Sequence, residues 1–192
     1  MLPRLTRTRR KDRTVPASSP LPIDPIAEAK RQWLDHGWAD AASGMAAVTS
    51  IMRAQQIMLA RVEGALKPFG LSFARFELLR LLAFSRGGAL PMSSATARLQ
   101  VHPTSVTNTV DRLERAGLVK RSPHPTDGRA TLLELTDAGT EVVGKATDAL
   151  NETVFSKPGF ADDDLADLVS ILAQFRRRSG DFGDPPTIPD PL

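Results

Sequence analysis

Hydrophobic residues recur at helical spacing along most of the chain, and the stretches between them change to a strand pattern or to turns. Val106, Val110 and Leu113 stand at i, i+4 and i+7, on one stripe of a helix expected over about 103–116. A shorter helix, from about Ser93 to Leu99, precedes it across a turn. Together they predict a helix-turn-helix in which the second helix keeps one face open.

A hairpin is expected directly after the second helix. Leu118 to Arg121 is a short apolar and basic run, and Thr131 to Leu135 is rich in residues that favour strands. The segment between them, Ser-Pro-His-Pro-Thr-Asp-Gly-Arg, consists mostly of turn residues and predicts a projecting loop over about 122–131. Two short helices followed by a hairpin are typical of a winged helix-turn-helix, which reads DNA.

The same periodicity predicts helices before and after this unit. The helix over Ser72–Ser85 is apolar around most of its circumference and is therefore expected to be buried. The set comprises Ile26–His36, Ser43–Lys67, Ser72–Ser85, Asp137 to about Val154, and Asp162–Arg178. The predicted fold class is mainly α, of the α+β kind, because one small sheet accompanies the helices.

The open face of the second helix carries small polar side chains and arginines. Hydroxyl and amide groups near a helix N-terminus can approach base edges in a major groove, and arginine further along can reach phosphates. A polar face alone is also typical of a solvated surface, but the hairpin with Arg129 near its tip favours DNA; Asp127 and Gly128 are expected to shape this wing. The residues expected to contact DNA are His102, Pro103, Thr104, Ser105, Thr107, Asn108, Arg112, Lys120, Arg121 and Arg129.

At these residues the chain closely resembles the multiple-antibiotic-resistance regulator (MarR) family. The resemblance rests on Asp111-Arg112-Leu113-Glu114-Arg115-Ala116-Gly117-Leu118-Val119, on Asp127-Gly128-Arg129, and on Leu135-Thr136-Asp137-Ala138-Gly139. It extends from about Ser43 to Arg178. It implies a homodimeric winged-helix transcriptional regulator that binds a pseudo-palindromic operator in double-stranded DNA, usually as a repressor released by a small molecule.

The resemblance also implies a division into a DNA-binding lobe and a helical dimerisation lobe. Residues 1–25 are expected to be a disordered basic arm and 180–192 a disordered tail. Between them we expect N-terminal dimerisation helices over 26–67, the winged helix-turn-helix over 68–136, and C-terminal dimerisation helices over 137–179. The basic arm either adds phosphate contacts or is a solvated tail.

The C-terminal helices carry more apolar residues than one lobe needs, and we interpret the excess as the dimer interface implied by the resemblance. An ordinary intramolecular core is the alternative. The residues concerned are Val142, Val143, Leu150, Val154, Leu165, Leu168, Val169, Ile171 and Leu172.

The resemblance further implies a small aromatic or carboxylic acid effector between the dimer helices and the DNA-binding lobe. Aromatic rings with a nearby arginine can stack on and pair with an anionic ring, although aromatics at helical spacing also serve as core. The candidates are Trp38, Met45, Arg53, Phe69, Phe73, Arg75 and Phe76. The segment from Trp33 to Trp38 is an extension that either covers this pocket or supports the dimer.

Composition agrees with an intracellular regulator. The net charge of the 192 residues is only +3, but seven positive and three negative residues lie between Arg86 and Arg129, in the predicted DNA-binding region. Without cysteine there is neither a disulfide nor a thiolate metal site, and a cytoplasmic location is expected. No apolar run approaches the ~20 residues of a membrane span.

Other function classes receive less support from the sequence. The three histidines are far apart, so no metal site or other cofactor is expected. Neither a phosphate loop, a Gly-rich nucleotide motif nor a nucleophile elbow is present, which argues against an enzyme. A nonspecific architectural DNA-binding protein without an effector is the remaining alternative.

Overall fold

The computed structural model describes residues 21–99, 103–124, 126–127 and 130–183, with the backbone alone at 103 and 104. In this part of the chain, all seven predicted helices are present. They are α1 (Pro25–Asp35), α2 (Ala39–Leu66), α3 (Phe73–Phe84), α4 (Met92–Leu99), α5 (Pro103–Arg115), α6 (Asp137–Leu150) and α7 (Asp162–Arg178). The three strands are β1 (Ala89–Pro91), β2 (Val119–Pro123) and β3 (Thr131–Leu135). The mainly α fold class with one small sheet is thus confirmed.

The chain divides into two compact units, one ending at Ala54 and the other beginning at Gln55. The first contains α1 and the start of α2. Asp24 caps α1 by accepting a hydrogen bond from the Ile26 N–H at 2.9 Å. On its exposed face, hydrogen bonds from Arg31 and then Gln32 lower the pKa of Glu28 to about 2.

The α1–α2 connection carries the aromatic extension noted in the sequence. Gly37 has a φ of 82°, which suits a residue without a side chain, and the turn brings two tryptophans together. The Trp33 and Trp38 rings meet edge to face with centroids 5.4 Å apart. The extension is therefore an ordered helical turn.

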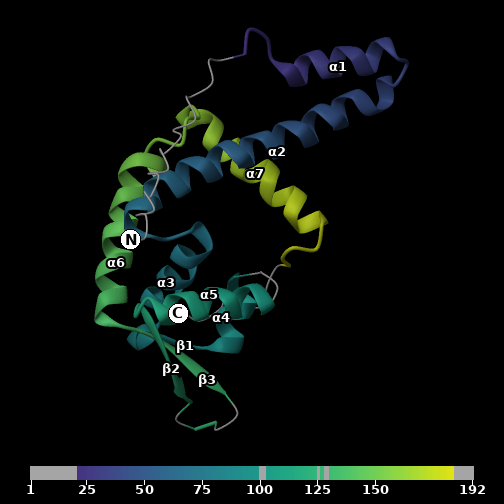
Figure 1. The fold of residues 1–192 in the computed structure, drawn as a ribbon. Coiled ribbons are helices and arrows are strands. Elements are labelled where there is room, and N and C mark those ends of the chain that lie inside the picture. Colours follow the sequence, from purple (N-terminus) through teal and green to yellow (C-terminus); the bar gives the residue numbers. More distant parts are fainter. Residues whose placement is uncertain (1–20, 100–102, 125, 128–129, 184–192) are drawn as a thin grey trace, which may run out of the picture. The chain divides into compact units, whose positions relative to one another are not determined.

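The second unit holds the sheet and one continuous core. The strands are antiparallel in the order β1-β3-β2, and Figure 1 shows the β2–β3 hairpin extending away from α4 and α5. Helix α3 contributes Phe76, Leu78, Leu79 and Leu82 to this core, whereas Phe84 is 61% exposed, so the helix is buried on part of its circumference only. The buried residues of this core are Val62, Leu66, Leu71, Phe76, Leu78, Leu79, Leu82, Ala95, Val106, Val110, Leu113, Val119, Leu133, Val143, Ala146, Leu150 and Val154.

Strand β1 was not predicted. It consists of three residues, each half-buried, and pairs with β3 so that Leu90 lies opposite Leu133. An alternation of buried and exposed residues cannot be recognised over so short a segment, and Pro91 argues against a strand when the sequence is considered alone. Only the pairing with β3 identifies these three residues as a strand.

The interpretation of the C-terminal apolar residues as a dimer interface is wrong for part of the set. Val143, Leu150 and Val154 are buried in the core of the second unit, and Val142 packs against that core. Residues 151–155 form a π-helical turn at the end of α6, where an α-helix was expected. By contrast, α7 has no buried residue.

The start of α6 passes very close to the start of β2. A Cβ added to Gly139 would lie 2.1 Å from the Leu118 carbonyl oxygen and 2.8 Å from Leu135 Cδ1. Thr136 fixes this crossing, because its hydroxyl donates to the Gly117 carbonyl at 2.8 Å and accepts from the Gly139 N–H at 3.0 Å. The N-cap of α6 therefore also holds the end of the helix–hairpin connection.

Replacing Gly139 by alanine should lower the free energy of unfolding by about 1–3 kcal/mol, because backbone must shift to admit the methyl group. Urea-induced unfolding measures the change. Gly144 on the same helix is the matched control, since nothing lies within 4 Å of its added Cβ. Gly144→Ala should stabilise the protein by about 0.5–1 kcal/mol. Equal losses in the two variants would contradict the close approach at Gly139.

Candidate nucleic-acid interface

Helix α5 has the two faces that its sequence predicts. Val106, Val110 and Leu113 are at most 1% exposed, so the apolar stripe is in the core. The helix ends at a left-handed Gly117, with φ 72°, whose N–H donates to the Glu114 carbonyl at 2.9 Å. The side chains on the opposite face are exposed, namely Ser105, Thr107, Asn108, Arg112 and Arg115.

Helix α4 supports α5 from within the same unit. It contacts both α3 and α5, and its Ala95 is fully buried, which lets neighbouring helices approach closely. The residues between the two helices, including His102, lie outside the described part of the chain, as do the side chains of Pro103 and Thr104. Their expected contacts with DNA stay predictions.

Strand β2 presents different residues to its two sides. Side chains alternate along a strand, so Val119 and Arg121 face α5 while Lys120 and Ser122 face outward. Val119 is buried, which identifies the inner side. Of the two predicted cationic DNA contacts on this strand, Arg121 is therefore directed toward the protein.

On the inner side, Arg121 bridges two carboxylates of α5. Its Nη2 lies 2.5 Å from Asp111 Oδ1, its Nη1 pairs with Glu114 Oε2, and its backbone N–H donates to Glu114 Oε1 at 3.3 Å. Partial burial lowers the pKa of the guanidinium, but the hydrogen bonds with Asp111 and Glu114 outweigh it, so that pKa is raised. The group is charged and engaged on both arms of its fork.

On the outer side, the Glu134 carboxylate of β3 interacts with two polar side chains of β2. Ser122 donates to its carboxylate and Lys120 Nζ lies 2.9 Å from Oε2. These hydrogen bonds, with that of Ser122 first, lower the pKa of Glu134. Lys120 remains 61% exposed, so its ammonium is accessible from solvent despite this pair.

The described ends of the wing converge in a turn. His124 N–H donates to the Ala130 carbonyl at 3.1 Å, and the Ala130 N–H donates to the Asp127 carbonyl at 3.0 Å. Gly128 and Arg129 lie outside the described residues, so the predicted contact of Arg129 with DNA is not tested. The backbone on either side has the closed geometry that a hairpin wing requires.

The seven candidate effector residues are divided between the two units. Trp38, Met45 and Arg53 belong to the first unit. In the second, Phe69 is half-buried against the core, and Phe73 and Phe76 stack at 6.4 Å.

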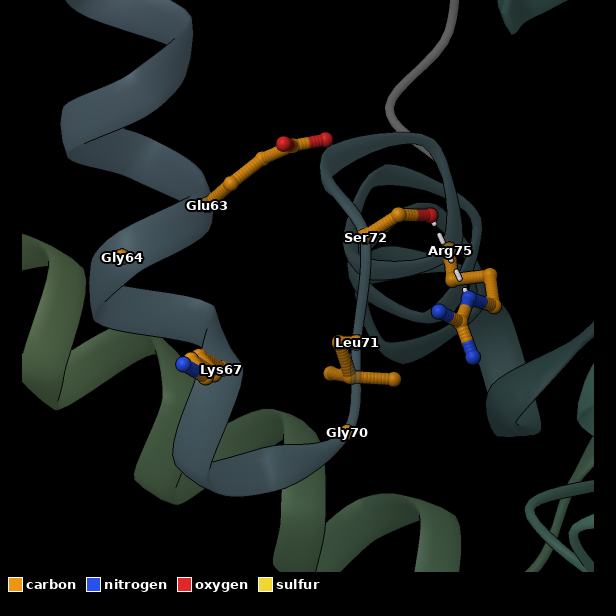
Figure 2. Close-up of a pocket in the computed structure, with 7 residues that line it drawn as sticks. All are labelled: Glu63, Gly64, Lys67, Gly70, Leu71, Ser72 and Arg75. Carbon is orange, nitrogen blue, oxygen red and sulfur yellow. Dashed lines mark hydrogen bonds between the residues drawn. The ribbon is translucent and has the colours of Figure 1, made fainter. Parts of the chain in front are cut away.

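Arg75 lines a separate hollow of about 490 Å³. Figure 2 shows the Lys67 ammonium at the edge of α2 that lies away from Arg75, so the two cations of this hollow do not come together. The Arg75 Nε donates to Ser72 Oγ at 3.2 Å.

A second hollow, of about 330 Å³, lies over the exposed side of α3 and is called the α3 hollow below. Its aromatic walls include the Phe73–Phe76 stack, and its polar groups are two arginines and one glutamate. Its lining consists of Phe73, Phe76, Glu77, Arg80, Leu81, Phe84, Arg98, Leu99 and Phe155. Sequence analysis missed most of these residues because they come from three separate elements.

Arg80 is the most unusual group of the α3 hollow. Its guanidinium lies 4.8 Å from the centroid of the Phe84 ring, and its buried Nε has no hydrogen-bond partner among the described residues. Burial also raises the pKa of Glu77. The α3 hollow therefore combines aromatic walls with two arginines, Arg80 and Arg98.

The described residues contain no group of three potential metal ligands. Over the same part of the chain, no helix is long and apolar enough to cross a membrane.

Comparisons with known proteins agree with this geometry. A MarR-family model matches residues 69–130, from the turn before α3 to the end of the wing. Sco5413, a MarR family transcriptional regulator from Streptomyces coelicolor, is 50% identical with a TM-score of 0.66, over 74% of this chain and 99% of Sco5413. The chain belongs to the MarR family.

Two further relatives extend the comparison. An uncharacterized HTH-type transcriptional regulator of Mycobacterium leprae is 30% identical over 97 residues, or 50% of this chain and 68% of that protein. The transcriptional repressor CouR, solved bound to a 23-mer DNA duplex, is 25% identical with a TM-score of 0.61, over 67% of this chain and 90% of CouR. MarR-family proteins are transcription regulators rather than enzymes, and this chain is a MarR-family transcriptional regulator with a winged helix.

Proposed function

We propose that this regulator binds a specific pseudo-palindromic operator in double-stranded DNA, with α5 in the major groove and the 122–131 wing on the minor groove or backbone. The observation that carries the proposal is the division of α5 into a fully buried apolar stripe and an exposed face of Ser105, Thr107 and Asn108. The DNA complex of CouR supports it by similarity. Nonspecific architectural binding is the alternative, and it requires no such polar reading face.

Replacing Asn108 by alanine should reduce discrimination at particular base pairs by about 1–3 kcal/mol, because an amide can make a bidentate contact with adenine. Replacing Arg112 by glutamine should instead weaken binding to all sequences and reduce the slope of log affinity against log salt by roughly 1. A duplex enriched from a random pool by the wild-type protein, and its single-base variants, provide the measurement.

Asn151→Ala, an exposed change at the end of α6, is the matched control and should leave binding unchanged. If the wild-type protein binds the enriched duplex and random DNA equally well, the architectural alternative is correct and sequence-specific binding is not.

We also propose that the regulator is a homodimer, in which α7 supplies part of the interface. Val169 and Phe175 are 66% and 62% exposed, and they flank the half-buried Leu172 on one side of this helix. An exposed apolar stripe of this size is costly in water and is typical of an association surface. Two copies of the reading helix also match the two-fold symmetry of a pseudo-palindrome.

Replacing Val169 by glutamate should convert the dimer to monomer without unfolding it, because the side chain is exposed within the chain and would be buried only between copies. Sedimentation equilibrium measures the mass, and circular dichroism measures the helix content. Ser170→Glu adds the same charge on the opposite side of α7 and should leave the dimer intact. A dimer of unchanged strength in the Val169 variant would contradict the interface.

We further propose that the regulator represses transcription in the cytoplasm and is released from DNA by a small aromatic carboxylate. The α3 hollow supports this proposal because it combines the stacked Phe73–Phe76 pair with the Arg80 guanidinium, which lies over the Phe84 ring. Arg98 and Leu99 of α4 also line it, and α4 packs directly on α5. A ligand there contacts the element that supports the reading helix.

Benzoate, as the simplest aromatic carboxylate, should bind more weakly to the protein–operator complex than to the free protein. Saturating benzoate should weaken operator binding by the same factor, because the coupling between two sites is reciprocal. Titrations in the presence and absence of the enriched duplex measure both affinities. Arg80→Met should weaken benzoate binding, whereas Arg75→Met, in the other hollow, should not. Equal benzoate affinities with and without DNA would contradict the coupling.

A further inference from the structure

Arg121 occupies a position where a core residue is expected. It follows Val119 on the inner side of β2 and lies opposite Leu133 of β3, and both of these neighbours are buried. Its side chain is only 27% exposed. An arginine at such a position covers apolar surface with its methylene groups and directs its guanidinium along the neighbouring helix.

The partners of this guanidinium stand on the flank of α5, between its buried stripe and its exposed face. Asp111 and Glu114 are three residues apart and therefore lie side by side on the helix. Arg121 reaches Asp111 at 2.5 Å and pairs with Glu114, whose carboxylate also accepts the Arg121 backbone N–H. One residue of the hairpin thus holds two adjacent points of the helix.

This bridge has two physical consequences for α5. It resists rotation of the helix about its own axis relative to the hairpin, because such rotation separates Asp111 or Glu114 from the fixed fork. It also offsets one of the two negative charges next to the exposed face, where uncompensated negative charge would repel phosphates.

We propose that Arg121 is a positioning residue, which sets the rotation of the reading helix against the wing hairpin, and that it is not a DNA contact. The proposal rests on the DNA binding proposed above. A phosphate would have to compete with two carboxylates that already hold this guanidinium in charge-assisted hydrogen bonds. Lysine cannot replace arginine in this role, because an ammonium lacks the planar fork that spans two carboxylates.

The test compares Arg121→Lys, Arg121→Met, Glu114→Gln and the double variant Arg121→Met/Glu114→Gln in the full chain. Each is measured against the duplex enriched by the wild-type protein and against its single-base variants, at several salt concentrations. Thermal unfolding of each variant separates loss of fold from loss of positioning. Arg31→Lys is the matched control, because Arg31 also bridges two carboxylates, Glu28 and Asp35, but on α1.

Positioning predicts that Arg121→Lys, although it keeps the charge, lowers discrimination between the enriched duplex and its variants by about tenfold. The salt slope of Arg121→Lys and Arg121→Met should stay at the wild-type value. Glu114→Gln should also lower discrimination. The double variant should lose no more discrimination than Arg121→Met alone, because both changes break the same bridge. Arg31→Lys should bind as the wild type does.

A different set of results overturns the proposal. If Arg121→Met reduces the salt slope by roughly 1 and Arg121→Lys restores it, Arg121 contacts a phosphate directly. If Arg121→Lys and Glu114→Gln keep full discrimination, the bridge does not position α5. If the wild-type protein itself shows no preference for the enriched duplex, the proposed function fails, and this inference fails with it.

Discussion

The close approach of α6 to Leu118, in the short connection between α5 and β2, is the constraint on which the DNA-binding unit depends. At Gly139 the helix lies so near the Leu118 carbonyl that only a hydrogen atom fits between them. Thr136 then ties the Gly117 carbonyl to the start of α6 through one hydroxyl. The end of the reading helix, the start of β2, the end of β3 and the start of α6 therefore meet at one small junction. A shift of any one of these elements would therefore displace the other three.

Three arginines illustrate how differently one residue type is used within the second unit. Arg112 is exposed on the open face of α5 and is available for a partner outside the chain. Arg121 is held by two carboxylates within the chain. Arg80 lies over an aromatic ring, and its buried Nε has no hydrogen-bond partner among the residues that the structure describes. Net charge treats the three as equal, but only their surroundings decide what each can bind.

Sequence patterns predicted the parts of the fold that local periodicity controls. The stripe of Val106, Val110 and Leu113 located α5 and its open face, and Gly117 located its end. The patterns did not distinguish an apolar residue that serves the chain's own core from one that serves a partner, which is why Val143 and Leu150 were assigned to the dimer. The sequence patterns could not predict the α3 hollow either, since Phe73, Arg98 and Phe155 become neighbours only through the tertiary fold. Strand alternation after Val119 would have placed Arg121 on the inner side of β2, whereas the sequence analysis grouped it with the expected DNA contacts.

The π-helical turn at residues 151–155 has a consequence for how the α3 hollow can change. An α-helix has about 3.6 residues per turn, so a residue five positions on from Leu150 would point well away from the side that Leu150 occupies. The wider π-turn brings Phe155 back toward that side, beside the buried Val154, where it forms a wall of the hollow. One wall of this hollow therefore depends on the number of residues in the turn as well as on the side chain at position 155. Deleting a single residue from the turn would restore a regular helix and turn the side chain at position 155 away from the hollow, which changes the shape of the hollow through the backbone.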